Sequence, residues 1–289
     1  MRLITFEHGG QVAAGYLDGD EAVICASGPE ADRAVLSVIE GGTAALEAWS
    51  NGDGRRVPVG EIRLKAPIPA PLRDLFCVGK NYYAHAAEFH SSGFDSSAQE
   101  QVPSHPVIFT KATTSVCGPG DIVKGSLDPT QTVDYEGELG VVIGKRCFGV
   151  SRAEAYDHVF GYLVVNDVTS RELQKKHNQW VLGKGIDTFC PMGPWIATAD
   201  EVGDVTELEL VTEINGEERQ RVTVADLIFN IPTLIETMSR TMTLLPGDII
   251  ATGTPVGVGI GFKPPRYLAK GDRMKVSITG LGTLENEIG

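Results

Sequence analysis

The sequence predicts an α+β fold that is mostly β-strand, with a small α/β module at its N-terminal end. Three short apolar runs each follow a Gly-Asp turn, at residues 119–123, 246–250 and 270–276. A turn followed by branched apolar residues is typical of a strand. Strands outnumber the predicted helices without regular β-α-β alternation, so we expect a mostly antiparallel or mixed arrangement of strands.

The N-terminal module is predicted to span residues 1–65. Apolar runs at residues 3–6 and 12–17, separated by two glycines, indicate a β-hairpin. Helices are expected over residues 30–40 and 43–49.

Residues 66–73 are predicted to connect this module to a larger catalytic domain at residues 74–289. Prolines recur at every second position of the connector, and they bias the backbone toward an extended conformation. In the larger domain helices are expected at four places: residues 81–89, 152–156, 170–176 and 231–240. The last of these carries apolar residues at helical spacing.

Three carboxylates in apolar surroundings predict a metal site. Glu136 and Glu138 lie two residues apart in an apparent buried strand, so their side chains share one face. Asp167 ends a second apolar run, where a strand end would hold it over the same site. Burying three carboxylates together is costly unless a cation compensates. Oxygen ligands without His or Cys favour Mg²⁺ or Mn²⁺ over zinc, and the alternative is a polar sheet face with solvated acids.

The composition excludes several classes of protein. A hydrophobic content of 42% is sufficient for a packed core. The net charge of −13 argues against a nucleic-acid partner and against binding to an anionic membrane. No apolar run approaches the roughly 18 residues of a membrane span, and the first residues contain no signal-peptide apolar region.

The five cysteines are far apart and contain no C-x-x-C pair, so neither a zinc knuckle nor a disulfide framework is indicated. Isolated cysteines in apolar runs are usually small core residues. We therefore expect a cytoplasmic location.

A possible catalytic base follows the first apolar run of the larger domain. His85 and Glu88 are three residues apart, so they share a face of the expected helix. A carboxylate that orients an imidazole raises its basicity, which suits the activation of water. The alternative is a surface pair. Residues 90–104 form a polar, Ser-rich stretch next to this pair, and they are expected to be a mobile loop, either a lid or plain surface.

Further polar residues lie near the third carboxylate and in two glycine-containing segments. Arg171 and Gln174 are expected on the helical face that Asp167 begins, beside the metal or in a surface salt bridge. Lys184 lies in an apolar, Gly-flanked segment, where it either pairs with a carboxylate or faces substrate. The Gly-rich loop at 251–259 lacks the Gly-Lys-Ser/Thr ending of a phosphate loop, so nucleotide binding is not expected there, and the alternative is a tight turn.

The order of these motifs resembles the fumarylacetoacetate hydrolase superfamily over residues of about 74–289. The motifs are G-K-N-Y-x-x-H-x-x-E, F-x-K, E-x-E-L-x-x-V-I-G, N-D-V-T-x-R-x-x-Q, G-K-x-x-D-T-F-x-P-x-G-P and P-G-D-I-I-x-T-G-T-P-x-G-V-G. Residues 261–268 resemble the subgroup of fumarylacetoacetate hydrolase domain-containing proteins, the acylpyruvase and oxaloacetate decarboxylase type. The resemblance implies a mixed β-sandwich roll and a homodimer.

The resemblance also implies roles for individual residues. It makes Glu136, Glu138 and Asp167 ligands of Mg²⁺ or Mn²⁺. It makes His85, Glu88 and Lys184 catalytic, and it makes a further set substrate-binding: Lys80, Lys111, Arg171, Gln174 and Thr254. Larger members of the family have one more aspartate ligand upstream, and the residues around Lys80 offer none. This difference argues against hydrolysis of fumarylacetoacetate itself.

The sequence therefore predicts a Mg²⁺- or Mn²⁺-dependent hydrolase that cleaves a C–C bond of a 2,4-dioxo acid of the acylpyruvate or fumarylpyruvate type, as in aromatic catabolism. His85 would activate water, and the metal and Lys184 would stabilise the departing pyruvate enolate. Decarboxylation of oxaloacetate and isomerisation of a 2-hydroxyhepta-2,4-diene-1,7-dioate are the alternatives on the same residues. A catalytically silent small-molecule binding protein is the alternative from a different class.

Overall fold

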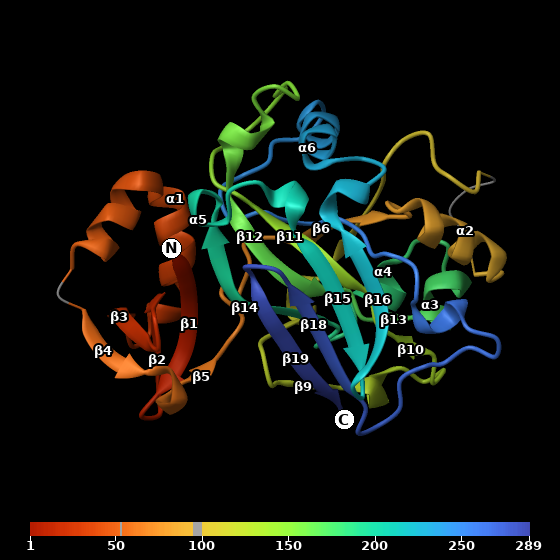
Figure 1. The fold of residues 1–289 in the computed structure, drawn as a ribbon, viewed down its shortest axis with the longest axis horizontal. Helices are drawn as coiled ribbons and strands as arrows, with labels where there is room; N and C mark the ends of the chain where they lie inside the picture. The colour runs from red at the N-terminus through yellow and green to blue at the C-terminus, as the bar shows by residue number, and fades with distance from the viewer. Residues whose placement is uncertain (53, 95–99) are drawn as a thin grey trace.

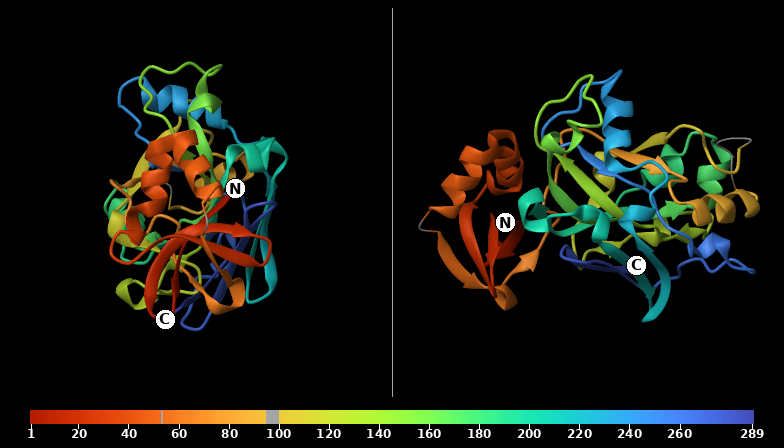
Figure 2. Two further views of the ribbon diagram at one scale, coloured as in Figure 1. Left: turned by 90° about the vertical axis from the view of Figure 1, so that its left-hand side faces the viewer. Right: turned by 45° about the horizontal axis from the view of Figure 1, so that its top comes forward.

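The computed structural model describes residues 1–52, 54–94 and 100–289. Two main β-sheets pack face to face, and the N-terminal strands and helix lie at one end of the molecule (Figure 1). The views in Figure 2 show the same arrangement from two other sides. The expected α+β, mostly β, sandwich fold is confirmed.

The larger sheet has twelve strands, and its main path runs β4-β3-β2-β1-β14-β12-β11-β17-β6-β7. Its strands are β1 (Arg2–His8), β2 (Gln11–Asp18), β3 (Glu21–Ser27), β4 (Arg55–Pro58), β5 (Arg63–Leu64), β6 (Leu75–Gly79), β7 (Val107–Lys111), β8 (Val116–Cys117), β11 (Gly137–Ile143), β12 (Val159–Asn166), β14 (Cys190–Thr198) and β17 (Ile249–Ala251). Because β1 pairs with β14, the N-terminal hairpin continues the central sheet. Most pairs are antiparallel, whereas β17 and β6 are parallel, so the sheet is mixed.

The smaller sheet has five strands in the order β16-β15-β18-β19-β9. Its strands are β9 (Ile122–Val123), β15 (Glu209–Ile214), β16 (Glu217–Thr223), β18 (Arg273–Ile278) and β19 (Gly282–Ile288), and a separate pair is formed by β10 (Val133–Asp134) and β13 (Thr169–Ser170). The three predicted turn-and-strand segments are confirmed, since they contain β9 and the first residues of β17 and β18.

The two faces of β12 pack against different layers. Tyr162 and Val164 belong to the apolar core that also contains Leu210 and Val276 of the smaller sheet. The alternate residues of β12, such as Leu163, belong to a second core that contains residues of the N-terminal helix. The strand is therefore buried on both sides, which explains its nearly continuous apolar sequence.

The helices are α1 (Ala31–Ser50), α2 (Tyr83–Ser91), α3 (Arg171–Lys176), α4 (Val181–Lys184), α5 (Ala199–Val202) and α6 (Ile231–Ser239). The two helices expected at 30–40 and 43–49 are both present, because α1 is interrupted at Gly42, where φ is 61°. Figure 1 shows α2, α3 and α4 on the side of the molecule away from α1.

Three helical expectations need correction. The helix expected at 152–156 is wrong, because turn residues there lead into a 3₁₀ helix at Ala155–His158, and Ser151 Oγ bonds Glu154 Oε2 at 2.6 Å in that turn. The helix α2 begins two residues late, because the Asn81 side chain is bonded to the backbone at residues 229 and 252. Asp167 does not begin the helix that contains Arg171, since the two residues of β13 come between them.

Three other sequence expectations concern a membrane span, the cysteines and the Ser-rich loop. No helix in the three described ranges is long and apolar enough to cross a membrane. All five cysteines are free thiols, and four of them are buried. The loop expected at 90–104 begins two residues late, because α2 continues to Ser91, and residues 95–99 lie outside the described residues.

Candidate active site

The three predicted ligands come together at the junction of β11 and β12. Glu138 pairs with Val165 in the sheet, and the backbone N–H of Asp167 donates to the carbonyl of Glu136 at 2.8 Å. One oxygen from each of the three carboxylates lies within 4.8 Å of the other two, and all three residues are buried. Strand alternation and the β11–β12 pairing therefore produce the cluster that the sequence predicts.

The charges in this cluster are unevenly compensated. Burial, followed by the nearby Asp167 and Glu136 charges, raises the pKa of Glu138 well above its usual value. Burial acts in the same direction on Glu136, but Lys184 and then Arg171 outweigh it and lower the pKa of Glu136 to about 2. A divalent cation among the three oxygens would offset the repulsion at Glu138, and the all-oxygen donor set suits Mg²⁺ or Mn²⁺. The residues therefore fit the predicted ion.

Two buried lysines lie beside the acids. Lys184 Nζ donates to Glu136 Oε2 and to Asp167 Oδ2, both at 2.7 Å. Burial lowers the pKa of Lys184, but the charges of Asp167 and Glu136 outweigh burial and raise the pKa above its usual value. The side chain therefore stays a cation. Lys111 Nζ lies 2.7 Å from Asp167 Oδ1, donates to the Val168 carbonyl at 3.0 Å, and does not line the pocket described below. This placement suits an ion-pair role for Lys111 better than direct contact with substrate.

Arg171 is held at two of its three nitrogens. Its Nε donates to Asp134 Oδ2 at 2.8 Å, and its Nη1 donates to Glu136 Oε1 at 2.6 Å and to Gln174 Oε1 at 3.2 Å. The remaining Nη2 is buried and has no hydrogen-bond partner in the described part of the chain. A buried guanidinium nitrogen without a partner is suited to receive an anionic oxygen.

The imidazole of His85 is oriented by Glu88. His85 Nδ1 lies 3.1 Å from Glu88 Oε2 within α2. Glu88 in turn accepts from the backbone N–H of Gly257. Because an ionised carboxylate only accepts, Nδ1 is the donor in this pair, and in the neutral imidazole Nε2 carries the lone pair.

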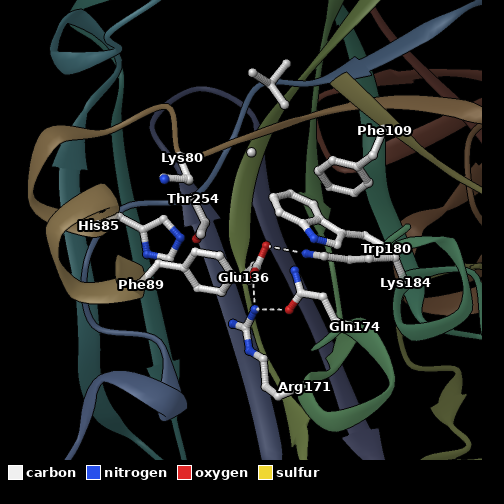
Figure 3. Close-up of a pocket in the computed structure, with 12 residues that line it drawn as sticks. Lys80, His85, Phe89, Phe109, Glu136, Arg171, Gln174, Trp180, Lys184 and Thr254 are labelled. Atoms are coloured by element: carbon white, nitrogen blue, oxygen red, sulfur yellow. Dashed lines mark hydrogen bonds and ion pairs between the residues drawn. The ribbon is translucent and has the colours of Figure 1, made fainter. Parts of the chain in front are cut away.

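One pocket collects most of the predicted side chains. Its lining includes seven of them: Lys80, His85, Glu136, Arg171, Gln174, Lys184 and Thr254. Figure 3 shows Lys80 and His85 on one side of Glu136, and Lys184 on the other. Lys80 has a left-handed backbone conformation, with φ of 56°, and its Nζ donates to the Glu100 carbonyl at 2.8 Å. Strained backbone of this kind persists where the surrounding structure fixes it, often at functional sites.

An aromatic wall, defined as Phe89, Phe109 and Trp180, closes the pocket. The ring centroids of Trp180 lie 6.0 Å from Phe89 and 5.1 Å from Phe109, with edge-to-face geometry in both pairs. Lys184 Nζ lies 5.1 Å from the Phe109 ring centroid. The pocket therefore combines basic groups with a rigid apolar wall, which suits a small organic acid.

The Gly-rich loop at 251–259 is more than the tight turn that its sequence suggested. Backbone N–H groups of Gly253 and Gly259 donate to Glu138 and Asp134 at 2.9 and 2.7 Å, and Ile260 donates to Asp134 at 3.0 Å. With the bond from Gly257 to Glu88, this loop binds three buried or half-buried carboxylates. Sequence reasoning missed Asp134 because its partners are distant in sequence, although it lies two residues before Glu136.

The chain matches the family model described as the C-terminal domain of fumarylacetoacetate (FAA) hydrolase over residues 74–289. Oxaloacetate tautomerase YisK of Bacillus subtilis (strain 168) is 50% identical over 229 residues, which are 79% of this chain and 74% of that protein.

Solved structures resemble the whole chain. The fumarylacetoacetate hydrolase of Exiguobacterium antarcticum has a TM-score of 0.83 at 37% identity, covering 100% of this chain and 99% of that one. Maleylpyruvate hydrolase from Sphingobium sp. SYK-6, solved with manganese(II) and pyruvate, has a TM-score of 0.78 at 34% identity, covering 100% and 98%.

Proposed function

Because the chain belongs to the fumarylacetoacetate hydrolase family, we propose that it is an enzyme that moves a proton on a short 2-oxo acid, with keto–enol interconversion of oxaloacetate as its first activity. The supporting observation is that one pocket is lined by His85, which Glu88 orients, and by Lys184 and Arg171, which flank Glu136. A base and cations on opposite sides of a bound acid are what enolisation requires. The 50% identity to an oxaloacetate tautomerase points to the same substrate.

Proton transfer would begin at His85. Its free Nε2 would remove a proton from C3 of the keto form, and the electron pair would move through C2 to the 2-oxo oxygen. Lys184 and the unpartnered Nη2 of Arg171 would stabilise the resulting negative charge. Return of the proton to that oxygen gives the enol, and the reverse sequence regenerates the ketone.

Glu136, Glu138 and Asp167 would hold Mg²⁺ or Mn²⁺, which when bound supplies Lewis-acid polarisation of the 2-oxo group. Arg171 and Gln174 would orient the carboxylate next to that group, and the aromatic wall would exclude water. Manganese in the maleylpyruvate hydrolase structure supports the choice of ion.

Hydrolysis of an acylpyruvate is the second candidate, and the anchored His85–Glu88 pair favours it. In that reaction Nε2 takes a proton from water, and the hydroxide attacks the C4 carbonyl. The C3–C4 bond then breaks, its electrons form the pyruvate enolate, and C3 is protonated. Decarboxylation of oxaloacetate needs the same enolate without activated water.

A panel of three reactions tests this proposal. The purified protein is assayed with Mg²⁺, with Mn²⁺ and with EDTA for enol-oxaloacetate decay, pyruvate release from oxaloacetate and cleavage of acetylpyruvate. We expect metal-dependent tautomerisation faster than the spontaneous rate. Absence of metal-dependent acceleration in all three reactions would overturn the proposal and favour the binding-protein alternative. The homodimer implied by the resemblance is tested separately by light scattering after gel filtration.

A further inference from the structure

Gln220 is a buried amide on a strand whose other residues are exposed or partly exposed. It lies in the middle of β16, at the edge of the smaller sheet, and it is the one residue of that strand that is fully buried. A buried amide is unfavourable unless its polar groups are paired, and an apolar residue would be the simpler choice here. Its position therefore calls for a specific set of partners.

The amide has those partners, and they fix its orientation. Gln220 Nε2 donates to Thr254 Oγ1 and to the Pro255 carbonyl, both at 2.8 Å. Its Oε1 accepts from the backbone N–H of Gly137 at 3.1 Å. A carbonyl can only accept and a backbone N–H can only donate, so the nitrogen and oxygen of the amide cannot be exchanged.

This orientation determines what the Thr254 hydroxyl can do. The hydroxyl has one proton and two lone pairs, and it uses a lone pair to accept from Gln220. No acceptor for its proton occurs among the hydrogen bonds of the described residues. Thr254 is buried and lines the pocket, and Figure 3 shows its oxygen between His85 and Glu136. The proton is therefore available to an oxygen atom of a bound acid.

Gln220 also connects the two sides of the site. Gly137 lies between the two glutamates of the acid cluster, and Thr254 lies in the Gly-rich loop. A Cβ at Gly137 would lie 2.3 Å from Thr212 Oγ1 and 3.3 Å from Gln220 Oε1, so this close approach requires glycine. The amide thus sets the distance between the loop and the strand that carries the carboxylates.

We propose that Gln220 is a positioning residue that holds the Thr254 hydroxyl as a hydrogen-bond donor toward a carboxylate or carbonyl oxygen of the substrate. This inference rests on the proposed function for the identity of the substrate. It assigns a role in the active site to a residue of the second sheet that contacts neither the reacting atoms nor the acid cluster.

The test is a double-mutant cycle with oxalate, a small planar dianion, as the bound probe. Oxalate affinity is measured by calorimetry in the presence of Mg²⁺ for the wild type, Gln220→Glu, Thr254→Val and the double variant. In Gln220→Glu the carboxylate accepts the Thr254 proton and so withdraws it from the pocket. We expect each single change to weaken binding about tenfold or more, and the double variant to be no weaker than Thr254→Val.

Three controls keep the test specific. Thr254→Ser retains the hydroxyl and should restore affinity, and the exposed change Gln11→Glu should leave it unaltered. Gln220→Met replaces the glutamate variant if that protein does not fold, because it also removes the donor to Thr254. Melting temperature and circular dichroism verify the fold of each variant.

The outcomes separate this inference from the proposed function. Additive losses, unchanged affinity in a folded Gln220 variant, or no oxalate binding by the wild type would overturn the positioning role. A failure of the proposed function would appear instead in the wild-type assays with oxaloacetate and acetylpyruvate. Where turnover is measurable, KM should rise more than kcat falls in both single variants.

Discussion

Arg171 Nε donates to Asp134 Oδ2 at 2.8 Å, and neither side chain has any exposure to solvent. Asp134 accepts three further bonds, from the backbone N–H groups of Tyr135, Gly259 and Ile260. Because four donors point at this carboxylate, both of its oxygens must accept, and a side-chain amide NH₂ at this position would face other donors. This carboxylate fixes the arginine and the Gly-rich loop relative to each other.

Asp134→Asn should therefore lower the free energy of unfolding by about 3–5 kcal/mol, because an amide nitrogen would face donors and Arg171 would lose one of its two carboxylate partners. Urea unfolding at pH 7 measures the loss. Asp204→Asn is the matched control, since that exposed aspartate also accepts a backbone N–H, from Thr206. The control should change stability by no more than about 0.5–1 kcal/mol, and equal losses in both variants would contradict the argument.

Glu138→Gln should remove metal binding without unfolding the apoprotein. Burial and the neighbouring carboxylates raise the pKa of Glu138, so its charge is unfavourable until a cation is bound. We expect the melting temperature in EDTA to be unchanged or higher than that of the wild type. The stabilisation by Mn²⁺, about 2.7 kcal/mol at 100 times Kd for a single site, should disappear. The control Glu285→Gln, at an exposed position of β19, should keep the stabilisation by Mn²⁺. A full Mn²⁺ response in Glu138→Gln would mean that the ion binds elsewhere.

His85→Ala should separate the reactions that use a general base from the one that does not. Tautomerisation and hydrolysis should slow by about 10²–10⁴, the usual contribution of a positioned base. Metal-assisted decarboxylation should fall less, because loss of CO₂ forms the enolate without removal of a proton by a base. The three rates are measured on one preparation with saturating Mg²⁺, and equal losses in all three would show that His85 orders the pocket instead.

Gly79→Ala should alter the choice of substrate by displacing the aromatic wall. A Cβ at Gly79 would lie 2.4 Å from Cζ3 and 2.8 Å from Cη2 of Trp180, so the indole must move. We expect the ratio of kcat/KM between short and long acylpyruvates to change about tenfold, the lower end of what one methylene group contributes to discrimination. Gly60→Ala meets no atom within 4 Å and is the control. An unchanged ratio would place the length-determining contact outside Trp180.

Asp128→Asn should destabilise the protein in a pH-dependent way. Burial raises the pKa of Asp128, but bonds from Thr130, Thr132 and Ser170 outweigh this and lower it below 3.8. Because the folded pKa is depressed, the stabilisation is present above the unfolded pKa of about 3.9 and is lost as pH falls through the folded value. The difference in unfolding free energy between wild type and variant should therefore be constant above about pH 5 and shrink as the pH falls below about 4, whereas Asp20→Asn, an exposed control, should show no such trend. A difference that is constant with pH would refute this account.

Local rules predicted the parts of the site whose residues are close in sequence. Strand alternation places Glu136 and Glu138 on one face, and helical spacing joins His85 to Glu88. The helix expected at 152–156 failed for a local reason too, since five residues are too few to favour a helix by themselves and the Ser151–Glu154 bond supports a turn.

The sequence by itself predicted the sandwich fold class, the cluster of three carboxylates and the candidate base, because strand period, residue chemistry and the order of motifs carry this information. The tertiary structure decided which distant residues form hydrogen bonds that hold the site residues in place. Asp134 meets Gly259 across 125 positions, and Gln220 meets Thr254 across 34. No local pattern encodes such bonds, because they exist only after β10, β16 and the Gly-rich loop have packed together, and the low exposure of those side chains is itself a product of that packing.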